Sequence, residues 1–585
     1  MTINNNKDLP FISRRSTVYG THAMVASSQP LATQAGIDIL KKGGNAADAA
    51  VAIAAVLNVT EPGSTGIGGD AFCLFFDAKT GTVKGLNGSG STPAALTLDY
   101  LRHHENIIGA SLATHSIHAI TVPGAAAAWV DTIEHFGSGK LDLTTLLTPA
   151  IDLAENGFPV SHISAHSWEK ETDNLKAVNK NNEWLIDNIR APKEGEMMTI
   201  PTLAKTFRKL ATEGKKGFYQ GEIGDRILKA LQERGSLMTA EDLAQHTSEL
   251  IEPISIDYHD WTVWEIPPNG QGITTLMALG IIEQLEELGL IDFSRIPQGS
   301  ADHLHIVTEA LRIAFADTRC WLGDPDKVQV PTKELLSKEY LRKRATELFN
   351  IKERNAKIER GDVLAGNTVY FSVVDEEGNA CSFINSLFMH FGSHVAVEDT
   401  GIVLHNRGCN FVLIEDHPNC LGPHKRPYHT IIPSMITCGD RLEACFGVMG
   451  AFMQPQGQVQ VILNLKHYAN NPQHALDLPR LCVAPPPLPP TTTKENDDDD
   501  DDDISSNAYH FTKVTDSVIY LEDGISEECQ RELETRGHTC YRLYHHDRAM
   551  FGRGQIIKVN LDPRTGHRVL AAGSDPRGDG CAFGW

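Results

Sequence analysis

The sequence predicts a layered protein in which helices pack against strands. Segments with helical periodicity dominate the first part of the chain, among them residues 45–57, 274–288 and 302–321. Short apolar strand candidates, separated by turns rich in Gly, Pro and Asn, concentrate after Thr368. The chain has 585 residues, of which 41% are hydrophobic and 22% charged, so it can bury a large core. These observations favour a layered architecture of helices and sheets.

The N-terminal part combines a strong helix former with a glycine-rich loop. Asn45 is a suitable N-cap for the Ala-rich segment 45–57. Residues 60–70 are rich in glycine, and a strand is expected over residues 71–77. A phosphate-binding loop requires the order strand, loop, helix. Because the order here is reversed, we expect a packed or anion-holding backbone loop.

Further elements follow the same patterns. Helices are expected over residues 122–136, 141–155, 201–213, 221–234, 338–358, 454–465, 472–476 and 526–536. Strands are expected over residues 401–404, 435–437, 445–447, 518–521, 555–560 and 569–573. Residues 484–514 are rich in proline and then aspartate, so we expect a disordered insertion there.

A β-hairpin is predicted at the start of the strand-rich part. Residues 369–375 and 380–388 are apolar strand candidates joined by a polar turn that contains Gly378. A three-residue loop with Gly378 in the left-handed conformation sets the register. That register places Thr368 directly opposite Ser386, with Cβ atoms roughly 5 Å apart. Either the two hydroxyls work together, or Thr and Ser simply favour strands.

Composition excludes several classes of protein. The formal net charge is −23 and no basic run offsets it, so binding to nucleic acid or anionic lipid is not expected. The sequence has no apolar signal segment and no long apolar stretch, so we expect a cytoplasmic protein that does not span a membrane. Eleven cysteines without a Cys-x-x-Cys pair argue against a disulfide framework and a structural zinc site.

Several common catalytic motifs are absent. No Gly-x-Ser-x-Gly elbow, Walker loop or His-Glu-x-x-His helix occurs. The pairs His303/His305 and His545/His546 allow metal binding, but surface or capping roles are the commoner use of such pairs. We therefore predict neither a cofactor nor a metal.

Thr368 becomes a useful nucleophile only if it is an N-terminal residue. A threonine hydroxyl needs a base within hydrogen-bond reach. A free α-amine, with a pKa of about 7.7–8.0, supplies one. Cleavage of the Asn367–Thr368 bond would create that amine, and the Thr368 hydroxyl could itself attack the preceding carbonyl. Ser386 would then orient the Thr368 hydroxyl.

These features resemble one enzyme family, the γ-glutamyltranspeptidases of the N-terminal-nucleophile hydrolase superfamily. The resemblance covers roughly residues 15–483 and 515–585. It is carried by residues 43–52, 61–69, 267–272, 312–317, the Thr368 hairpin, 425–427 and 574–577.

The resemblance implies a fold, a processing event and a catalytic apparatus. The family fold is of the α+β class, a four-layer αββα sandwich built from both processed pieces. Those pieces are here residues 1–367 and 368–585, which form a large/small heterodimer. The family's second hydroxyl matches Ser386, and its oxyanion hole matches the backbone N–H groups of Gly450 and Ala451. Backbone donors tolerate the Gly→Ala change where φ permits.

The departures from the family pattern concern the substrate. The family's carboxylate-binding Arg is absent from residues 86–93, and the acid that holds the substrate amino group is replaced by Asn410. A Ser-Ser pair is replaced by His429-Thr430, and a family Asn is replaced by Phe388. This pattern is similar to that of oxamate amidohydrolase and of γ-glutamyltransferase-like proteins. Arg407, Asn410, His429 and Thr430 are therefore the predicted substrate-binding residues.

The prediction is a self-processing hydrolase or acyltransferase that cleaves γ-glutamyl or other small amide bonds through an acyl-enzyme. Water or an amine accepts the acyl group. One alternative is an amidohydrolase or acylase for a non-glutamyl amide such as oxamate. A second alternative, from another class, is an unprocessed and catalytically silent scaffold.

Overall fold

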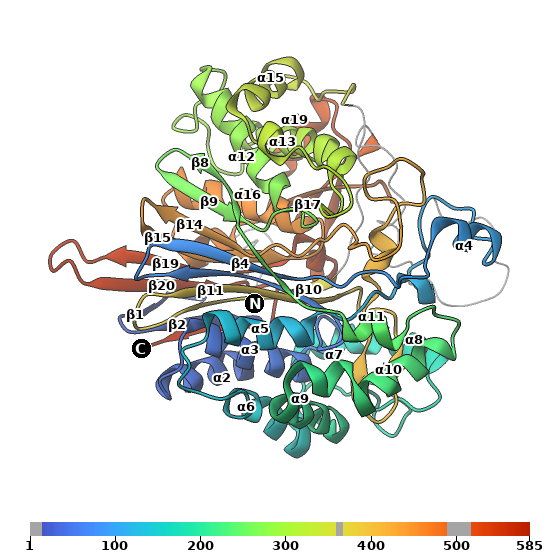
Figure 1. The fold of residues 1–585 in the computed structure, drawn as a ribbon. Helices are drawn as coiled ribbons and strands as arrows, with labels where there is room; N and C mark the ends of the chain where they lie inside the picture. The colour runs from blue at the N-terminus through green and yellow to red at the C-terminus, as the bar shows by residue number, and fades with distance from the viewer. Residues whose placement is uncertain (1–14, 359–366, 488–515) are drawn as a thin grey trace, which may run out of the picture.

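Two seven-stranded sheets lie face to face, and helices cover the outer face of each (Figure 1). The structure is a computed structural model that describes residues 15–358, 367–487 and 516–585. The layers follow the order helix, sheet, sheet, helix. The expected α+β class and αββα sandwich are thus confirmed.

The first sheet contains the predicted hairpin at its centre. Its strands follow the order β21 (Cys581–Gly584), β2 (Met24–Ser27), β10 (Asn367–Val374), β11 (Ala380–Phe388), β3 (Asp70–Asp77), β4 (Thr82–Gly88) and β7 (Glu249–Ile251). Every neighbouring pair is antiparallel. Strands that follow Thr368 in the chain therefore lie between strands that precede it, so a cut at that residue would not separate two domains.

The second sheet is also antiparallel throughout. Its strands follow the order β1 (Val18–Gly20), β20 (Arg568–Ser574), β19 (Arg553–Leu561), β15 (Arg441–Met449), β14 (Ser434–Cys438), β9 (Trp261–Glu265) and β8 (Ile254–Tyr258). Buried apolar side chains from both sheets fill the space between them, including Tyr370 and Ile384 from the first and Met435 and Ile557 from the second. This dry interface fixes the two sheets against each other.

Two groups of helices form the outer layers. Those on the first sheet are α2 (Pro30–Lys41), α3 (Ala46–Thr60), α5 (Ala125–Phe136), α6 (Leu143–Asn156), α9 (Pro201–Tyr219) and α10 (Gly221–Gln232). Those on the second are α12 (Gly272–Glu287), α13 (Ala301–Trp321), α15 (Lys338–Leu348), α16 (Met453–Lys466) and α19 (Glu527–Thr535). Helix α17 (Pro472–Asp477) packs against strands β19 and β20 of the same sheet.

Shorter elements complete the described chain. They are α4 (Leu98–His103), α7 (His162–Lys170), α8 (Thr172–Val178), α11 (Ala240–Ala244), α14 (Thr332–Leu335), η1 (Ile117–Ala119), η2 (Arg407–Asn410), η4 (His545–Phe551), β5 (Phe158–Pro159), β6 (Met197–Met198), β12 (Ala396–Val397), β13 (Ile402–Val403), β16 (Leu481–Ala484), β17 (Val518–Glu522) and β18 (Cys540–Leu543). Strands β16, β17 and β18 form a small separate sheet.

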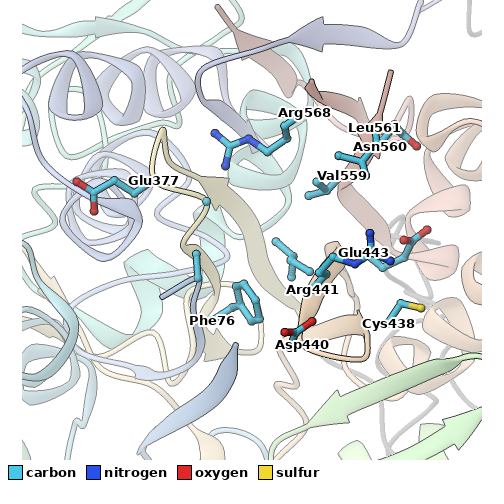
Figure 2. Close-up of a pocket in the computed structure, with 13 residues that line it drawn as sticks. Phe76, Glu377, Cys438, Asp440, Arg441, Glu443, Val559, Asn560, Leu561 and Arg568 are labelled. Carbon is cyan, nitrogen blue, oxygen red and sulfur yellow. The ribbon is translucent and has the colours of Figure 1, made fainter. Parts of the chain in front are cut away.

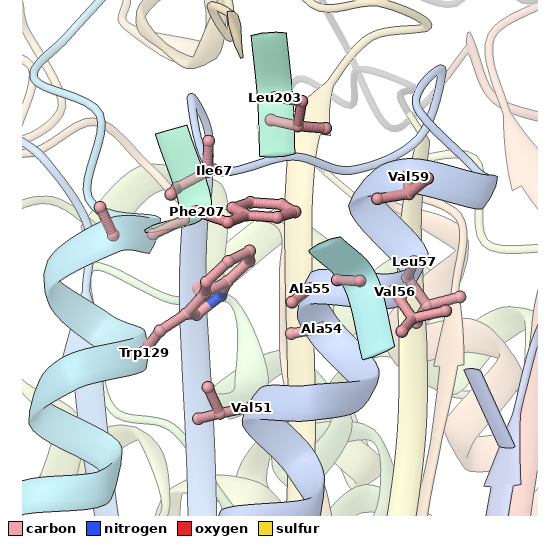
Figure 3. Close-up of a cluster of buried hydrophobic side chains, with 14 of the residues drawn as sticks. Val51, Ala54, Ala55, Val56, Leu57, Val59, Ile67, Trp129, Leu203 and Phe207 are labelled. Atoms are coloured by element: carbon pink, nitrogen blue, oxygen red, sulfur yellow. The ribbon is translucent and has the colours of Figure 1, made fainter. Parts of the chain in front are cut away.

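Helix α3 lies at the centre of the first helical layer, and every one of its residues is buried. The Asn45 side chain accepts from Ala47 and Asp48 N–H, and Asp48 accepts in return from Asn45 N–H, which makes a capping box. Figure 3 shows Trp129 of α5 and Phe207 of α9 beside the Ala-rich face of α3. The small alanine side chains allow these rings to approach the helix closely.

The hairpin has the predicted register from Val369 to Val374, with Val369 paired to Asn385. Gly378 has φ 92°, the left-handed conformation that the three-residue loop requires. The register shifts by one residue at the open end, where Asn367 pairs with Phe388. Thr368 therefore lies in a β-bulge, a feature that the sequence did not predict.

Two expectations about element boundaries were incomplete, and a third lies mostly outside the described residues. The helix expected over residues 338–358 ends at Leu348, because Asn350 Oδ1 accepts from Lys352 N–H and stabilises a turn instead. The strand expected over 445–447 extends over Arg441–Met449. Most of the expected insertion at 484–514 lies outside the described residues, and Ala484 ends strand β16.

A membrane-spanning helix needs both length and a predominantly apolar sequence, and none of the described helices has the two together.

Candidate active site

Thr368 and Ser386 meet at the open end of the hairpin, as the register predicted. Both side chains are fully buried. The Thr368 hydroxyl donates to Ser386 Oγ at 3.1 Å. The contact joins strands β10 and β11 at the point where their register shifts.

Ser386 is held by two further donors. Arg407 Nη2 donates to Ser386 Oγ at 2.9 Å, and Phe388 N–H donates to the same oxygen at 2.8 Å. Phe388 has φ 76°, and its ring centroid lies 4.5 Å from the Arg407 guanidinium. The hydroxyl of Ser386 is therefore fixed in one orientation.

Arg407 lies on the short helix η2 and is completely buried. Its Nη1 donates to Thr430 Oγ1 at 2.6 Å, so its hydrogen bonds to Ser386 and Thr430 go to hydroxyls rather than to a carboxylate. Its Nε has no hydrogen-bond partner among the described residues. Burial lowers the pKa of Arg407 to about 10, while the charge of Asp70 opposes that shift. Arg407 thus stays cationic at neutral pH.

Asn410 occupies the other end of the same helical turn. Its side chain is buried, and neither its amide nitrogen nor its amide oxygen has a hydrogen-bond partner in the described parts of the chain. Buried amides without partners are rare because each unmade bond costs about 1–3 kcal/mol. Arg407 Nε and the Asn410 amide are therefore buried polar groups whose hydrogen bonds a polar ligand could complete.

Asp70 is a site residue that sequence reasoning missed. It lies at the start of β3, directly opposite Ser386 on β11. Its Oδ1 accepts from Gly90 and Gly124 N–H, each at 3.2 Å. Its Oδ2 accepts from His429 Nε2 at 3.0 Å and lies 3.4 Å from His405 Nδ1. Burial alone would raise the pKa of Asp70, but His405 and the His429 hydrogen bond lower it to about 2.

His429 lies beside Asp70 as a neutral imidazole. Burial lowers the pKa of His429 to about 3, and the charge of Arg407 acts in the same direction. Its Nε2 faces Asp70 and its Nδ1 accepts from Ile431 N–H at 3.4 Å. These two contacts define one tautomer and use both nitrogens. His429 therefore supports Asp70, rather than facing a ligand as the sequence suggested.

The predicted oxyanion pair lies in the turn between β15 and α16. Gly450 has φ 126° and Ala451 has φ 48°, so Ala451 accepts the left-handed conformation in place of a glycine. Gln271 Nε2 donates to Ala451 O at 2.8 Å and holds the turn. Gln454, in the first turn of α16, approaches Thr368 Oγ1 with its Nε2 at 3.4 Å. This contact brings the turn to the Thr368 end of the hairpin, and Gln454 is a second residue that the sequence analysis missed.

The loop of residues 86–93, where the resemblance would place an arginine, is closely packed. A Cβ on Gly90 would lie 1.6 Å from Val122 O, and a Cβ on Gly88 would lie 2.7 Å from Ala71 O. Ser89 Oγ accepts from Asn269 Nδ2 at 3.1 Å. The loop thus supplies backbone support to Asp70 through Gly90, and its glycine positions have no room for a side chain.

A separate pocket of about 530 Å³ lies at the other end of the hairpin (Figure 2). Phe76, Arg441 and Arg568 line it together with the hairpin turn at Gly378. From Gly378 to Thr368 the strand runs roughly 20–30 Å. This pocket is therefore distinct from the site around Thr368.

The fold and these residues define an enzyme of the N-terminal-nucleophile hydrolase class that acts on amide bonds. The family model described as Gamma-glutamyltranspeptidase matches residues 32–585. The chain belongs to the γ-glutamyltranspeptidase family.

Similar proteins extend over nearly the whole chain. The Glutathione hydrolase-like YwrD proenzyme of Bacillus subtilis (strain 168) is 35% identical, covering 97% of this chain and 99% of that protein. The Oxamate amidohydrolase proenzyme of Klebsiella pneumoniae is 29% identical, covering 97% of this chain and 100% of that protein. The crystal structure of cephalosporin acylase from Bacillus halodurans superposes with a TM-score of 0.83 at 37% identity, covering 100% of this chain and 99% of that one.

Proposed function

We propose that this protein is a self-processing amidase whose nucleophile is Thr368. The observation that carries the proposal is the buried contact between the Thr368 and Ser386 hydroxyls at 3.1 Å, held from behind by Arg407. A nucleophile with a fixed neighbour that orients it is the arrangement that acyl transfer requires. The relatives in Bacillus subtilis and Klebsiella pneumoniae are both named as proenzymes, which supports the processing step.

The first reaction is cleavage of the chain itself. Thr368 Oγ attacks the carbonyl carbon of Asn367, and the C–N bond breaks as the nitrogen gains a proton. The resulting ester is hydrolysed by water to an Asn367 carboxylate and a free Thr368 α-amine. The pieces 1–367 and 368–585 remain together because their strands alternate within the first sheet.

The second reaction is turnover. The α-amine takes the proton from Thr368 Oγ as that oxygen attacks the substrate carbonyl. The same proton then passes to the leaving nitrogen, and an ester of Thr368 remains. Water attacks this ester and releases the acid, while an amine in place of water would give a transferred amide. Gly450 and Ala451 N–H groups stabilise the oxyanion in each step.

The substrate is a small amide that carries a carboxylate. Arg407 is buried and cationic, its hydrogen bonds to Ser386 and Thr430 go to hydroxyls, and its Nε is unpaired within the described residues. A buried cation of this kind is stabilised when a ligand supplies the anion. Because Arg407 contacts Ser386, the carboxylate would lie near the attacked carbonyl. Asn410 would donate to and accept from the same substrate.

Oxamate has this chemistry, and its carboxylate is bonded directly to the amide carbonyl. We therefore place hydrolysis of oxamate-like amides first. Glutathione hydrolysis is the second candidate, and the 35% identity to a glutathione hydrolase-like proenzyme favours it. In that case Arg407 would bind the α-carboxylate in place of the arginine that residues 86–93 lack.

Two measurements test the proposal. Purified protein is analysed by denaturing gel and N-terminal sequencing, and we expect two bands, the smaller of which begins with Thr368. Initial rates are then compared for oxamate, γ-glutamyl-p-nitroanilide and glutathione, with release of ammonia or amine as the signal. A single full-length band, with no turnover of any amide, would overturn the proposal.

A further inference from the structure

Three potential metal-binding side chains from distant segments converge on the side of the second sheet. His259 lies in the turn between β8 and β9, Glu286 in the last turn of α12, and His467 directly after α16. His259 Nε2 is 3.0 Å from Glu286 Oε2, and His467 Nε2 is 3.9 Å from the same oxygen. One donor atom from each residue lies within 4.8 Å of the other two.

We propose that His259, Glu286 and His467 bind one divalent transition-metal ion of the zinc type. Two imidazole nitrogens and one carboxylate oxygen are a donor set that zinc accepts. Bonds of about 2.0–2.2 Å place the donors of a tetrahedral site ~3.3 Å apart. The two distances to Glu286 lie on either side of that value, so small side-chain movements complete the geometry. His259 is 38% exposed, which leaves a route for the ion and a fourth position for water.

The two histidines are held in place by their surroundings. His259 has φ 55° and its N–H donates to Glu283 Oε1 at 2.9 Å, which fixes the turn on α12. The His467 ring packs against Phe293 with centroids 4.4 Å apart. The backbone N–H of His467 donates to Leu463 O at 2.9 Å, at the C-terminal end of α16. Little conformational freedom remains to be lost when an ion binds.

A tyrosine hydroxyl next to the three side chains supplies an outer hydrogen bond. The Tyr258 hydroxyl lies 2.6 Å from His467 Nε2 and 3.4 Å from Glu286 Oε2. When the ion takes the lone pair of His467, Tyr258 can turn its hydrogen bond to the carboxylate. Such an outer hydrogen bond to a ligating carboxylate is typical of metal sites.

The histidines that the sequence singled out have other contacts. His303 Nδ1 accepts from Gly299 N–H at 3.1 Å. His305 lies 2.8 Å from His538 Nε2 through its Nδ1. Among the described residues, only the group around Glu286 brings together three potential ligands of this kind. No fixed spacing in the sequence relates its members, which is why motif analysis did not find it.

The ion would join the two halves of the chain. His259 and Glu286 precede Thr368, and His467 follows it. If the proposed cleavage occurs, which this step assumes, the ion links the large piece to the small piece. Metal binding would then stabilise the processed heterodimer by mass action.

The test uses the purified full-length protein, treated with EDTA and then dialysed. Zinc chloride alone is titrated in a calorimeter, and bound metal is measured by mass spectrometry. We expect one zinc per chain, and a melting temperature that rises with zinc. His259→Asn, which tolerates the positive φ, and Glu286→Gln should each weaken zinc binding at least tenfold. His545→Asn is the matched control because His545 is also exposed and has φ 52°; it should bind zinc like the wild type.

The proposal would be overturned if the wild type bound no zinc. It would also be overturned if His259→Asn and Glu286→Gln bound zinc as tightly as the wild type, because the three side chains would then form only a hydrogen-bonded network. An uncleaved Thr368→Ala protein retains all three ligands and should bind zinc with unchanged stoichiometry. If the wild type itself remains one chain yet binds zinc, the processing proposal fails and the metal site stands.

Discussion

Asp70 on β3 is the direct cross-strand partner of Ser386 on β11, and its carboxylate accepts a hydrogen bond from His429 Nε2 at 3.0 Å. Thr430, next to His429, accepts from Arg407, which in turn donates to Ser386. Two buried hydrogen-bonded groups, one of Asp70 and His429 and one of Arg407, Thr430 and Ser386, thus lie next to each other at His429 and Thr430. The loss of one member of either group leaves its partners with unmade hydrogen bonds in a region of low dielectric.

Asp70→Asn should therefore weaken both catalysis and stability. The amide keeps the shape of the carboxylate but removes the charge that faces His429, His405 and the two glycine N–H groups. We expect kcat to fall about 100-fold with a smaller change in KM, and the free energy of unfolding to fall by ~3 kcal/mol. Steady-state kinetics and denaturant titration measure these two quantities. Asp77→Asn, at the more exposed end of the same strand, is the matched control, and an equal effect of both substitutions would contradict the assigned role.

Thr368→Ala should remain a single chain and show no turnover, because the nucleophile for both reactions is lost. Thr368→Ser keeps a hydroxyl and an α-amine, so it should be processed and retain measurable activity, although loss of the methyl group loosens the side chain. Gel mobility and ammonia release follow the two reactions separately. Normal turnover by the alanine variant would place the nucleophile elsewhere.

Arg407→Lys tests whether the guanidinium binds the substrate carboxylate. Lysine keeps the charge, but it cannot donate to Ser386 and Thr430 in the same plane while offering a third N–H to a ligand. We expect kcat/KM for oxamate to fall 10- to 100-fold. An uncharged amide of similar size should be less affected. Arg102→Lys is the control, because Arg102 is a partly exposed arginine that pairs with Glu415 at the surface.

The hairpin shows why part of this site could be predicted from sequence. Its register depends on local features, namely the period of two residues in each strand and a turn that needs Gly378 at positive φ. These features are sufficient to place Thr368 beside Ser386. The bulge at Thr368 does not follow from these local features, because Asn367 pairs with Phe388 one residue out of the predicted register.

The residues that were missed are those supplied by distant segments. Asp70 reaches Ser386 only because β3 pairs with β11, and Gln454 reaches Thr368 only because α16 begins beside the hairpin. Sequence patterns give the existence of a strand but not its neighbour in the sheet. A signal for Asp70 was present, since an acidic residue stands where a glycine-rich loop enters an apolar strand. His429 was predicted to contact the substrate. In the structure its two ring nitrogens instead contact Asp70 and Ile431 N–H.

Asn410→Asp should shift specificity toward γ-glutamyl substrates. Asn410 stands where the resemblance places an acid that holds the substrate amino group, and its amide has no partner among the described residues. A carboxylate there would attract an ammonium group, and Arg407 on the same turn would keep it ionised. We expect the ratio of γ-glutamyl-p-nitroanilide to oxamate turnover to rise at least tenfold. An unchanged ratio would show that Asn410 does not face the substrate; Asn410→Gln, which remains uncharged, separates charge from shape.

Glu61→Gln should change how stability depends on pH. Burial raises the pKa of Glu61 to about 7 against the pull of Arg553. Between pH ~4.5 and ~7 the unfolded chain releases this proton while the folded chain retains it, so folding stability falls as the pH rises through that window. The contribution amounts to at most ~3 kcal/mol and is constant above the upper limit. Glutamine cannot ionise, so the variant should lose this part of the decline. Denaturant titrations at pH 5 and pH 8 measure it, with the exposed Glu347→Gln as control; equal slopes for wild type and Glu61→Gln would show that Glu61 ionises normally in the folded protein.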